Sequence, residues 1–329
     1  MTTGVRADAR ILGDLSEAEV ILLFTDGASR PYPEVLVGNG DDAAVWQLRP
    51  KMAQVATTDG QVEGVHFTLD APAHAIGRKL LAVNLSDLAA MGAEPRYALI
   101  AACLPRDLLV EIARDIGRGA REIAFEHRVH LIGGNVTRSP KGVVLHATLL
   151  GEVEPSKIMR RSGLYAGDRL LVSGTLGNAR LGLRADVTHA VLKDALFDPV
   201  PRVGLGRALS ASGLVRAACD VSDGLARDAV RLVEQDRLGA VLDLAALPLS
   251  AAAREVTAAL GLDPQEIALL GGEDYELLVA VAPEDVEAAK DVARAEGETL
   301  TEIGVVSADP GLFSSNKVPL GKSGFEHFG

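Results

Sequence analysis

Apolar residues recur along the first half of the chain with two spacings, one typical of strands and one typical of helices. Alternating or short apolar runs predict strands at residues 43–48, 53–58, 98–104, 129–132 and 143–153. Helical spacing predicts helices over residues 72–91 and 107–127, and a capping box at Ser16 and Glu19 predicts an earlier helix that ends near residue 28. Strands and helices are therefore mixed, as in α/β or α+β folds.

The pattern stops over residues 154–168 and then resumes. This stretch holds Pro155 with two arginines and two glycines, and it has no apolar period, so it is typical of a connection between domains. Beyond it we predict strands at 169–173, up to Asp220, and at 240–244, 276–282 and 299–306, and helices within 178–212 and at 224–236, 249–260 and 283–296. The chain thus divides into two domains, residues 1–153 and 154–329.

Composition and charge exclude several classes of protein. An apolar content of 48% and a mean hydropathy of +0.18 are ample for a packed core in 329 residues, which excludes disorder as the main state. The net charge of −12 opposes binding to nucleic acid or to an anionic membrane, because both need an excess of basic residues. Two cysteines, Cys103 and Cys219, with no signal peptide or membrane span, favour a cytoplasmic protein.

Two short motifs resemble known signatures but lack their context. Residues 38–43 match the dinucleotide pattern GxGxxA, yet a predicted strand follows where that pattern needs a helix. Residues 220–224 read DVSDG, in which Asp220 replaces the first glycine of a nucleophile elbow. The chain also lacks a P-loop and the HExxH spacing of zincins. Rossmann, serine hydrolase, P-loop and zincin chemistry therefore have little support.

Acidic residues repeatedly stand beside glycine, serine or threonine, mostly where apolar strands are predicted to end. The groups are Asp41-Asp42, Thr57-Thr58-Asp59, Ser86-Asp87, the run from Asp220 to Asp223, and Gly271-Gly272-Glu273-Asp274. A single carboxylate at such a place is usually a turn residue or a helix cap. Asp87 differs, because it lies inside a predicted helix. Several carboxylates with hydroxyl oxygens suit Mg²⁺, and such a cluster would let an acidic protein bind a polyphosphate.

Eight motifs, in order over nearly the whole chain, resemble those of the thiamine-monophosphate kinases. They are GNGDDAAV (38–45), TTDGQVEGVHF (57–67), RKLLAVNLSDLAAMGAEP (78–95), LIGGNVTRSP (131–140), RRSGLYAGD (160–168), DVSDGLARD (220–228), GGEDYELL (271–278) and GFEHF (324–328). The NLSDLAAMGA stretch also resembles a wider superfamily with aminoimidazole-ribonucleotide synthetase. VEGVHF and GGEDYELL favour the thiamine enzymes within it.

This resemblance implies a two-domain α/β fold whose N-terminal strands form a barrel shared across a homodimer. It implies that the N-terminal domain binds ATP and metal and forms the dimer, and that the C-terminal domain completes the active site. It also implies ATP-dependent phosphorylation of thiamine monophosphate to thiamine diphosphate, with Mg²⁺ as cofactor. The acceptor phosphate is already ionised at neutral pH, so we expect direct in-line transfer without a catalytic base.

The resemblance also assigns roles to individual residues. It implies Mg²⁺ ligands at Asp42, Thr57, Thr58, Asp59, Asp87, Asn135, Asp220 and Asp223. It implies nucleotide contacts at Gly134, Asn135, Arg161 and Ser222, and contacts to thiamine monophosphate at His66, Glu273 and Phe325. Asp220, Asp223 and Arg161 are the expected catalytic residues. Plainer interpretations stay open: Phe325 as a core anchor, Arg161 as a solvated linker charge and His66 as a strand-end histidine.

The chain departs from the family pattern at two places. Asn135 stands where the family usually has a metal-binding aspartate, and Gly117-Arg118-Gly119 lacks an aromatic residue that the family often places ahead of a glycine. Two other functions therefore stay open beside the kinase. One is a superfamily enzyme that uses ATP on another acceptor, and the other is a thiamine phosphate-binding protein without turnover.

Overall fold

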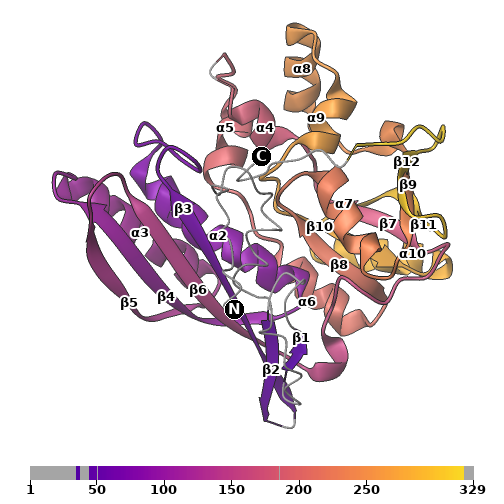
Figure 1. Ribbon diagram of the computed structural model, residues 1–329, viewed down its shortest axis with the longest axis horizontal. Helices are drawn as coiled ribbons and strands as arrows, with labels where there is room; N and C mark the ends of the chain where they lie inside the picture. The colour runs from indigo at the N-terminus through magenta and orange to yellow at the C-terminus, as the bar shows by residue number, and fades with distance from the viewer. Residues whose placement is uncertain (1–34, 38–43, 50, 185, 322–329) are drawn as a thin grey trace, which may run out of the picture.

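The computed structural model describes residues 35–37, 44–49, 51–184 and 186–321. Over these residues the chain forms two six-stranded sheets, one from each half of the sequence, with helices packed against them (Figure 1). The helix predicted from Ser16, and the predicted site residues Asp42 and Phe325, lie outside the described residues. No helix in the described ranges is both long and apolar enough to cross a membrane.

The N-terminal sheet has the strand order β1-β2-β3-β6-β4-β5. The strands are β1 (Val35–Val37), β2 (Ala44–Arg49), β3 (Met52–Val62), β4 (Glu94–Pro105), β5 (His130–Ser139) and β6 (Val144–Val153). Neighbours are antiparallel except β4 and β5, which are parallel and are joined through helix α3 (Val110–Glu126). Over the described residues this sheet is open, with β1 and β5 at its edges.

The C-terminal sheet has the strand order β12-β9-β11-β7-β10-β8, in which only β12 and β9 pair in parallel. The strands are β7 (Arg169–Ser173), β8 (Val215–Val221), β9 (Gly239–Leu242), β10 (Glu276–Val281), β11 (Leu300–Ser307) and β12 (Gly311–Ser314). The helices of this half are α4 (Asn178–Gly182), α5 (Ala190–Phe197), α6 (Val203–Ser212), α7 (Leu225–Glu234), α8 (Ala251–Leu260), α9 (Pro264–Leu270) and α10 (Val286–Ala295). Single 3₁₀ turns lie at Pro155–Lys157, Leu244–Ala246 and Pro283–Asp285.

Helix α2 (Ala73–Ala90) lies between the two halves and contacts both (Figure 1). It packs on β3 and β6 of its own domain and on β8 and α6 of the other. Its leucines share one apolar core with Leu171 and Leu277 of the C-terminal sheet. It also approaches α3 closely, because a Cβ on Gly77 would lie 1.8 Å from the Ile116 carbonyl oxygen. Side chains of α2 can therefore reach segments from both domains.

The mixed α/β architecture in two halves confirms the prediction from the sequence. The shared barrel is not formed by the described residues of one chain, so it stays a prediction. We did not predict β1, β12 or α9 from the sequence. Helix α9 could have been predicted, because Asp263 and Pro264 form an ordinary helix start. We also placed two strand boundaries too early. As a result, Asp59 and Asn135 lie inside β3 and β5 instead of in the loops after them.

Candidate active site

Two hydrogen bonds connect adjacent residues of α2 to different domains. The Thr57 hydroxyl on β3 donates to Asp87 Oδ2 at 2.6 Å, and the Ser86 hydroxyl donates to Asp220 Oδ2 on β8 at 2.8 Å. The sequence alone gives no reason for a carboxylate inside this helix. These contacts show that Asp87 joins a group of polar side chains from β3 and β8. The end of α2 therefore brings carboxylates from both domains together.

Burial makes the carboxyl groups of Asp87 and Asp220 weaker acids than usual. Burial raises the pKa of Asp87 well above its ordinary value, and the Asp220 charge raises it further, while the Thr57 hydrogen bond acts in the opposite direction. Burial also raises the pKa of Asp220, and the Ser86 hydrogen bond and the Arg161 charge lower it in part. The structure thus places Arg161 beside Asp220. Without a cation, the negative charges of two carboxylates this close repel each other.

Strand β3 separates the three residues of the TTD motif. Side chains alternate between the faces of a strand, so Thr57 and Asp59 share the face that packs on α2. The Asp59 charge contributes to the raised pKa of Asp87. Thr58 lies on the other face, where its hydroxyl donates to the Ala147 carbonyl and accepts from Thr148, both at 3.0 Å. The structure therefore does not bring the Thr58 hydroxyl to the cluster.

The DVSDG loop after β8 is held by Asp228 of α7, a residue that the sequence reading did not single out. Both the Ser222 and the Asp223 backbone N–H groups donate to Asp228 Oδ2 at 3.0 Å. Burial, with the Asp223 charge added, raises the pKa of Asp228 to about 7. The Asp223 carboxylate itself pairs with Arg231 at 2.6 Å and with Arg227 at 3.7 Å.

The GGEDY loop before β10 lies against the DVSDG loop. The Glu273 N–H donates to the Ser222 carbonyl at 2.7 Å, and the Tyr275 N–H donates to the Val221 carbonyl at 2.8 Å. Glu273 and Tyr275 both adopt the left-handed backbone conformation, with φ values of 64° and 51°. Such values are uncommon for residues with side chains, and they cluster at functional sites.

Neighbours of Tyr275 show how closely these segments converge. Burial raises the pKa of the Tyr275 hydroxyl, and the charges of Glu273, Asp59, Asp220 and Asp87 raise it further. These four carboxylates come from β3, α2, β8 and the GGEDY loop. Asp274, by contrast, has a structural role, because both of its carboxylate oxygens accept from the Gly177 N–H at 2.9 Å and so stabilise the start of α4.

Three further predicted residues lie in the N-terminal domain away from this cluster. His66 lies in the turn after β3, where its Nδ1 accepts from the Val62 N–H at 3.1 Å. Gly134 and Asn135 are exposed on the edge strand β5, and Asn135 pairs in register with Ala101. Two strands separate β5 from β3, so Asn135 lies about 14 Å across the sheet from the backbone of β3.

The donor set at the cluster has the chemistry of a Mg²⁺ site. Its members are hard oxygen atoms: the hydroxyl of Thr57 and the carboxylates of Asp59, Asp87 and Asp220. Asn84, one helical turn before Asp87, leaves its buried Oδ1 without a hydrogen-bond partner among the described residues. No group of three or more His, Cys, Asp or Glu side chains is arranged to hold a metal in the described part of the chain. Phosphate oxygens of a substrate would therefore have to complete the coordination.

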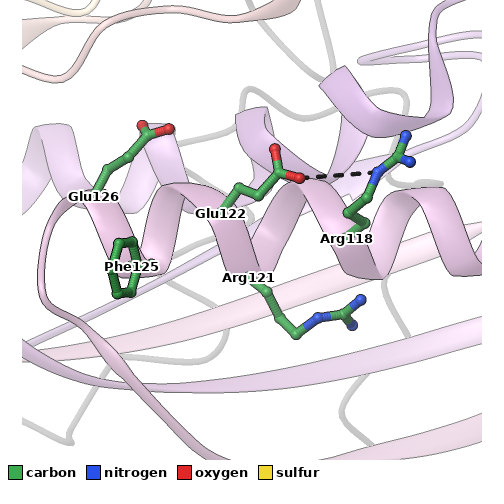
Figure 2. Close-up of a pocket in the computed structure, with 5 residues that line it drawn as sticks. All are labelled: Arg118, Arg121, Glu122, Phe125 and Glu126. Atoms are coloured by element: carbon green, nitrogen blue, oxygen red, sulfur yellow. Dashed lines mark ion pairs between the residues drawn. The ribbon is translucent and has the colours of Figure 1, made fainter.

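A pocket on α3 is separate from these residues. Figure 2 shows the side chains along one side of this helix that line a pocket of about 360 Å³, namely Arg118, Arg121, Glu122, Phe125 and Glu126. Arg118 and Glu122 form an ion pair at 3.9 Å, and Phe125 is 85% exposed. None of the predicted site residues lines it. The carboxylate cluster, not this pocket, is the candidate active site.

Comparisons with known proteins cover almost the whole chain. Residues 40–153 match the family described as AIR synthase related protein, N-terminal domain, and residues 165–315 match its C-terminal domain. A thiamine-monophosphate kinase from Rhodopirellula baltica is 38% identical over 89% of this chain and 90% of its own length. The enzyme of that name from Escherichia coli K12 is 36% identical over 95% of this chain and 98% of its own length.

Solved structures agree with these matches. AaThiL complexed with AMPPCP and TMP has a TM-score of 0.86 and 29% identity, with 98% of this chain and 99% of that chain covered. Thiamine-monophosphate kinase from Stenotrophomonas maltophilia K279a has a TM-score of 0.76 and 37% identity, with coverages of 92% and 98%. The hydrogenase maturation protein HypE from E. coli, at 22% identity and a TM-score of 0.70, shares the fold alone.

Proposed function

We propose that this chain, which belongs to the thiamine-monophosphate kinases of the AIR synthase-related family, phosphorylates thiamine monophosphate to thiamine diphosphate with ATP. The observation that carries the proposal is the cluster of Asp220, which is buried, with Asp59 and Asp87, which are half-buried. Its mutual repulsion is relieved when cations bind, and cations are what two polyanionic substrates need in order to approach each other.

In this proposal the residues of the cluster have different roles in phosphoryl transfer. Thr57, Asp59, Asp87 and Asp220 would hold Mg²⁺, which neutralises phosphate charge and aligns donor and acceptor oxygens when it is bound. Thr57 and Ser86 fix the carboxylate rotamers through their hydrogen bonds. Arg161, beside Asp220, contributes a permanent positive charge toward the nucleotide phosphates. No side chain has to remove a proton, because the attacking phosphate oxygen is already ionised.

The two loops from the C-terminal domain complete the site in this proposal. Asp228 holds the backbone of Ser222 and Asp223 rigidly, so that Ser222 contacts the nucleotide and Asp223 adds a further metal ligand. Glu273 and His66 contact thiamine monophosphate, and Phe325 covers its rings. In this proposal residues 1–153 bind ATP and metal and form the dimer, and residues 154–329 complete the active site. Gly134 and Asn135 bind the nucleotide and its metal from β5.

We also propose a homodimer formed through the N-terminal sheet. Tyr97 and Leu99 on one face of β4, and Ile132 at the bulge of the adjacent strand β5, are large apolar side chains that are 38–56% exposed. Exposed apolar residues gathered on adjacent strands are typical of protein interfaces. A second sheet packed there would close the barrel shared between two protomers.

We also propose that the enzyme acts in the cytoplasm, because its proposed substrates are ATP and thiamine monophosphate.

Removal of the metal is a direct test of the proposed chemistry. We expect protein treated with EDTA to form no thiamine diphosphate from ATP and thiamine monophosphate, and added Mg²⁺ to restore the reaction. Mg²⁺ with AMPPCP should also raise the melting temperature, since bound cations relieve the repulsion among the carboxylates. Product is measured by chromatography. Undiminished turnover in EDTA would show that the reaction does not need a metal ion.

Asp223→Asn tests the loop of the C-terminal domain. We expect a large loss of turnover with a change of only about 1 kcal/mol in the free energy of unfolding, because the ion pairs of Asp223 are partly exposed. Steady-state kinetics and thermal unfolding measure the two effects. A variant with full activity would exclude Asp223 from the metal site.

A further inference from the structure

Lys79 of α2 has no role in the proposed reaction, yet it is buried. It is 3% exposed, and it is the only lysine or arginine among the buried residues that the structure describes. An ammonium group loses its hydration on burial at a cost of several kcal/mol, so an apolar residue would fit this place more easily. Its Nζ lies 2.9 Å from Glu273 Oε1. The position of Lys79 therefore depends on Glu273.

Glu273 is fixed through both its backbone and its side chain. Its backbone is in the left-handed conformation, with φ at 64°, and its N–H is bound to Ser222. Its side chain is 28% exposed, and one oxygen, Oε1, is bound by Lys79. The second oxygen, Oε2, has no hydrogen-bond partner among the described residues. The pair thus presents one carboxylate oxygen in a fixed direction at the surface of the site.

The distance along α2 relates this oxygen to the transfer centre. Lys79 and Ser86 are seven residues apart, so they lie on the same side of the helix, about 10 Å from each other. Ser86 is bound to Asp220 in the carboxylate cluster. The Lys79 end of α2 therefore lies about two helical turns beyond the contact with Asp220, and the Glu273 backbone lies beside the DVSDG loop, where its N–H donates to Ser222 at 2.7 Å. A ligand whose phosphate binds at the cluster would bring its organic part to Glu273.

We propose that Lys79 is a positioning residue that fixes Glu273 for recognition of the organic part of the acceptor; this rests on the proposed function. Thiamine monophosphate carries a cationic ring and an amino group, and both suit a carboxylate oxygen. Without Lys79, the Glu273 side chain would be free to change rotamer, and its carboxylate would no longer point in one direction. Lys79 does not touch the substrate itself.

Lys79→Met tests the proposal, since methionine fills a similar volume without the charge. We expect the KM for thiamine monophosphate to rise about tenfold, the effect of losing one charge-assisted contact, while the KM for ATP changes by less than about twofold. Calorimetry with thiamine monophosphate alone should show the same loss of affinity. Arg78→Met is the matched control, because Arg78 pairs instead with Glu126 and Asp198. It should lower the melting temperature and leave both KM values unchanged.

A double-mutant cycle with Glu273→Gln separates positioning from general stabilisation. We expect Lys79→Met to add little to the KM of the Glu273→Gln variant, since Lys79 acts only through that carboxylate. Effects of the two substitutions that add in full, or equal changes in both KM values, would overturn the proposal. So would an unchanged KM for thiamine monophosphate in Lys79→Met. Failure of the proposed function differs, because the parent chain would then form no thiamine diphosphate.

Discussion

Asp87→Asn is expected to lose phosphoryl transfer by roughly a thousandfold, the size of effect seen when one preorganised electrostatic group leaves an active site. The same variant should melt at a temperature no lower than that of the parent chain. Asparagine keeps an oxygen that can accept the Thr57 hydrogen bond, and it removes one of two neighbouring carboxylate charges that repel each other. Turnover and thermal unfolding are both measured without added Mg²⁺ and with it.

The combination of these two results is diagnostic. Substitution of a residue that is needed only for packing lowers both the stability and the activity of the protein. A charge that is kept for metal binding destabilises the protein in the absence of metal, so its removal lowers the activity alone. Thr58→Val is a suitable control from the same motif as Thr57, because the Thr58 hydroxyl lies on the opposite face of β3. It should retain most of the activity. An Asp87→Asn variant that turns over normally would show that the cluster is not the transfer centre.

Arg202→Met should be the most destabilising single change in the C-terminal domain that we consider. Arg202 binds both oxygens of Glu276, at 2.6 and 2.7 Å, and also Glu298 at 2.9 Å. The Glu276 side chain is only 5% exposed, so removing Arg202 leaves a buried charge without its cation. Breaking such a pair costs about 3–5 kcal/mol, which corresponds to a drop in melting temperature of roughly 10 °C for a chain of this size.

The double variant Arg202→Met with Glu276→Leu controls for the loss of the pair as a whole. Replacing both partners of a buried ion pair by apolar residues is often close to neutral. We therefore expect the double variant to recover part of the lost melting temperature, although the Ser173 hydroxyl then loses its bond to Glu276. A double variant that is less stable than Arg202→Met would contradict this account of the ion pair.

Residue types and spacing predict much of the fold, because period and burial are local properties of a sequence. The long helix α2 and the strands β6 and β10 follow directly from their apolar patterns. Short edge strands such as β12 have too few residues for a period to emerge. The extension of β5 through Gly134 was missed for a related reason, since glycines interrupt an apolar alternation without ending a strand.

The candidate site shows a different limit. The acidic motifs could be identified one by one, but their pairing across domains depends on contacts between residues far apart in the sequence, such as Ser86 with Asp220. Lys79 and Asp228 lie within two of the family motifs, yet residue type and spacing assign them no role, because a lysine in a helix and an aspartate after DVSDG are ordinary on a surface. Only the three-dimensional structure shows that both are buried and bound to the site loops.

We infer that the carboxylate cluster between the domains transfers phosphate from ATP to thiamine monophosphate. The most direct measurement is the rate of ADP formation by the purified chain in Mg²⁺, with thiamine monophosphate present and absent. We predict that ADP forms only when thiamine monophosphate is present, with one thiamine diphosphate produced for each ADP. ADP formation that does not depend on thiamine monophosphate, or thiamine monophosphate that binds without any ADP appearing, would contradict the claim.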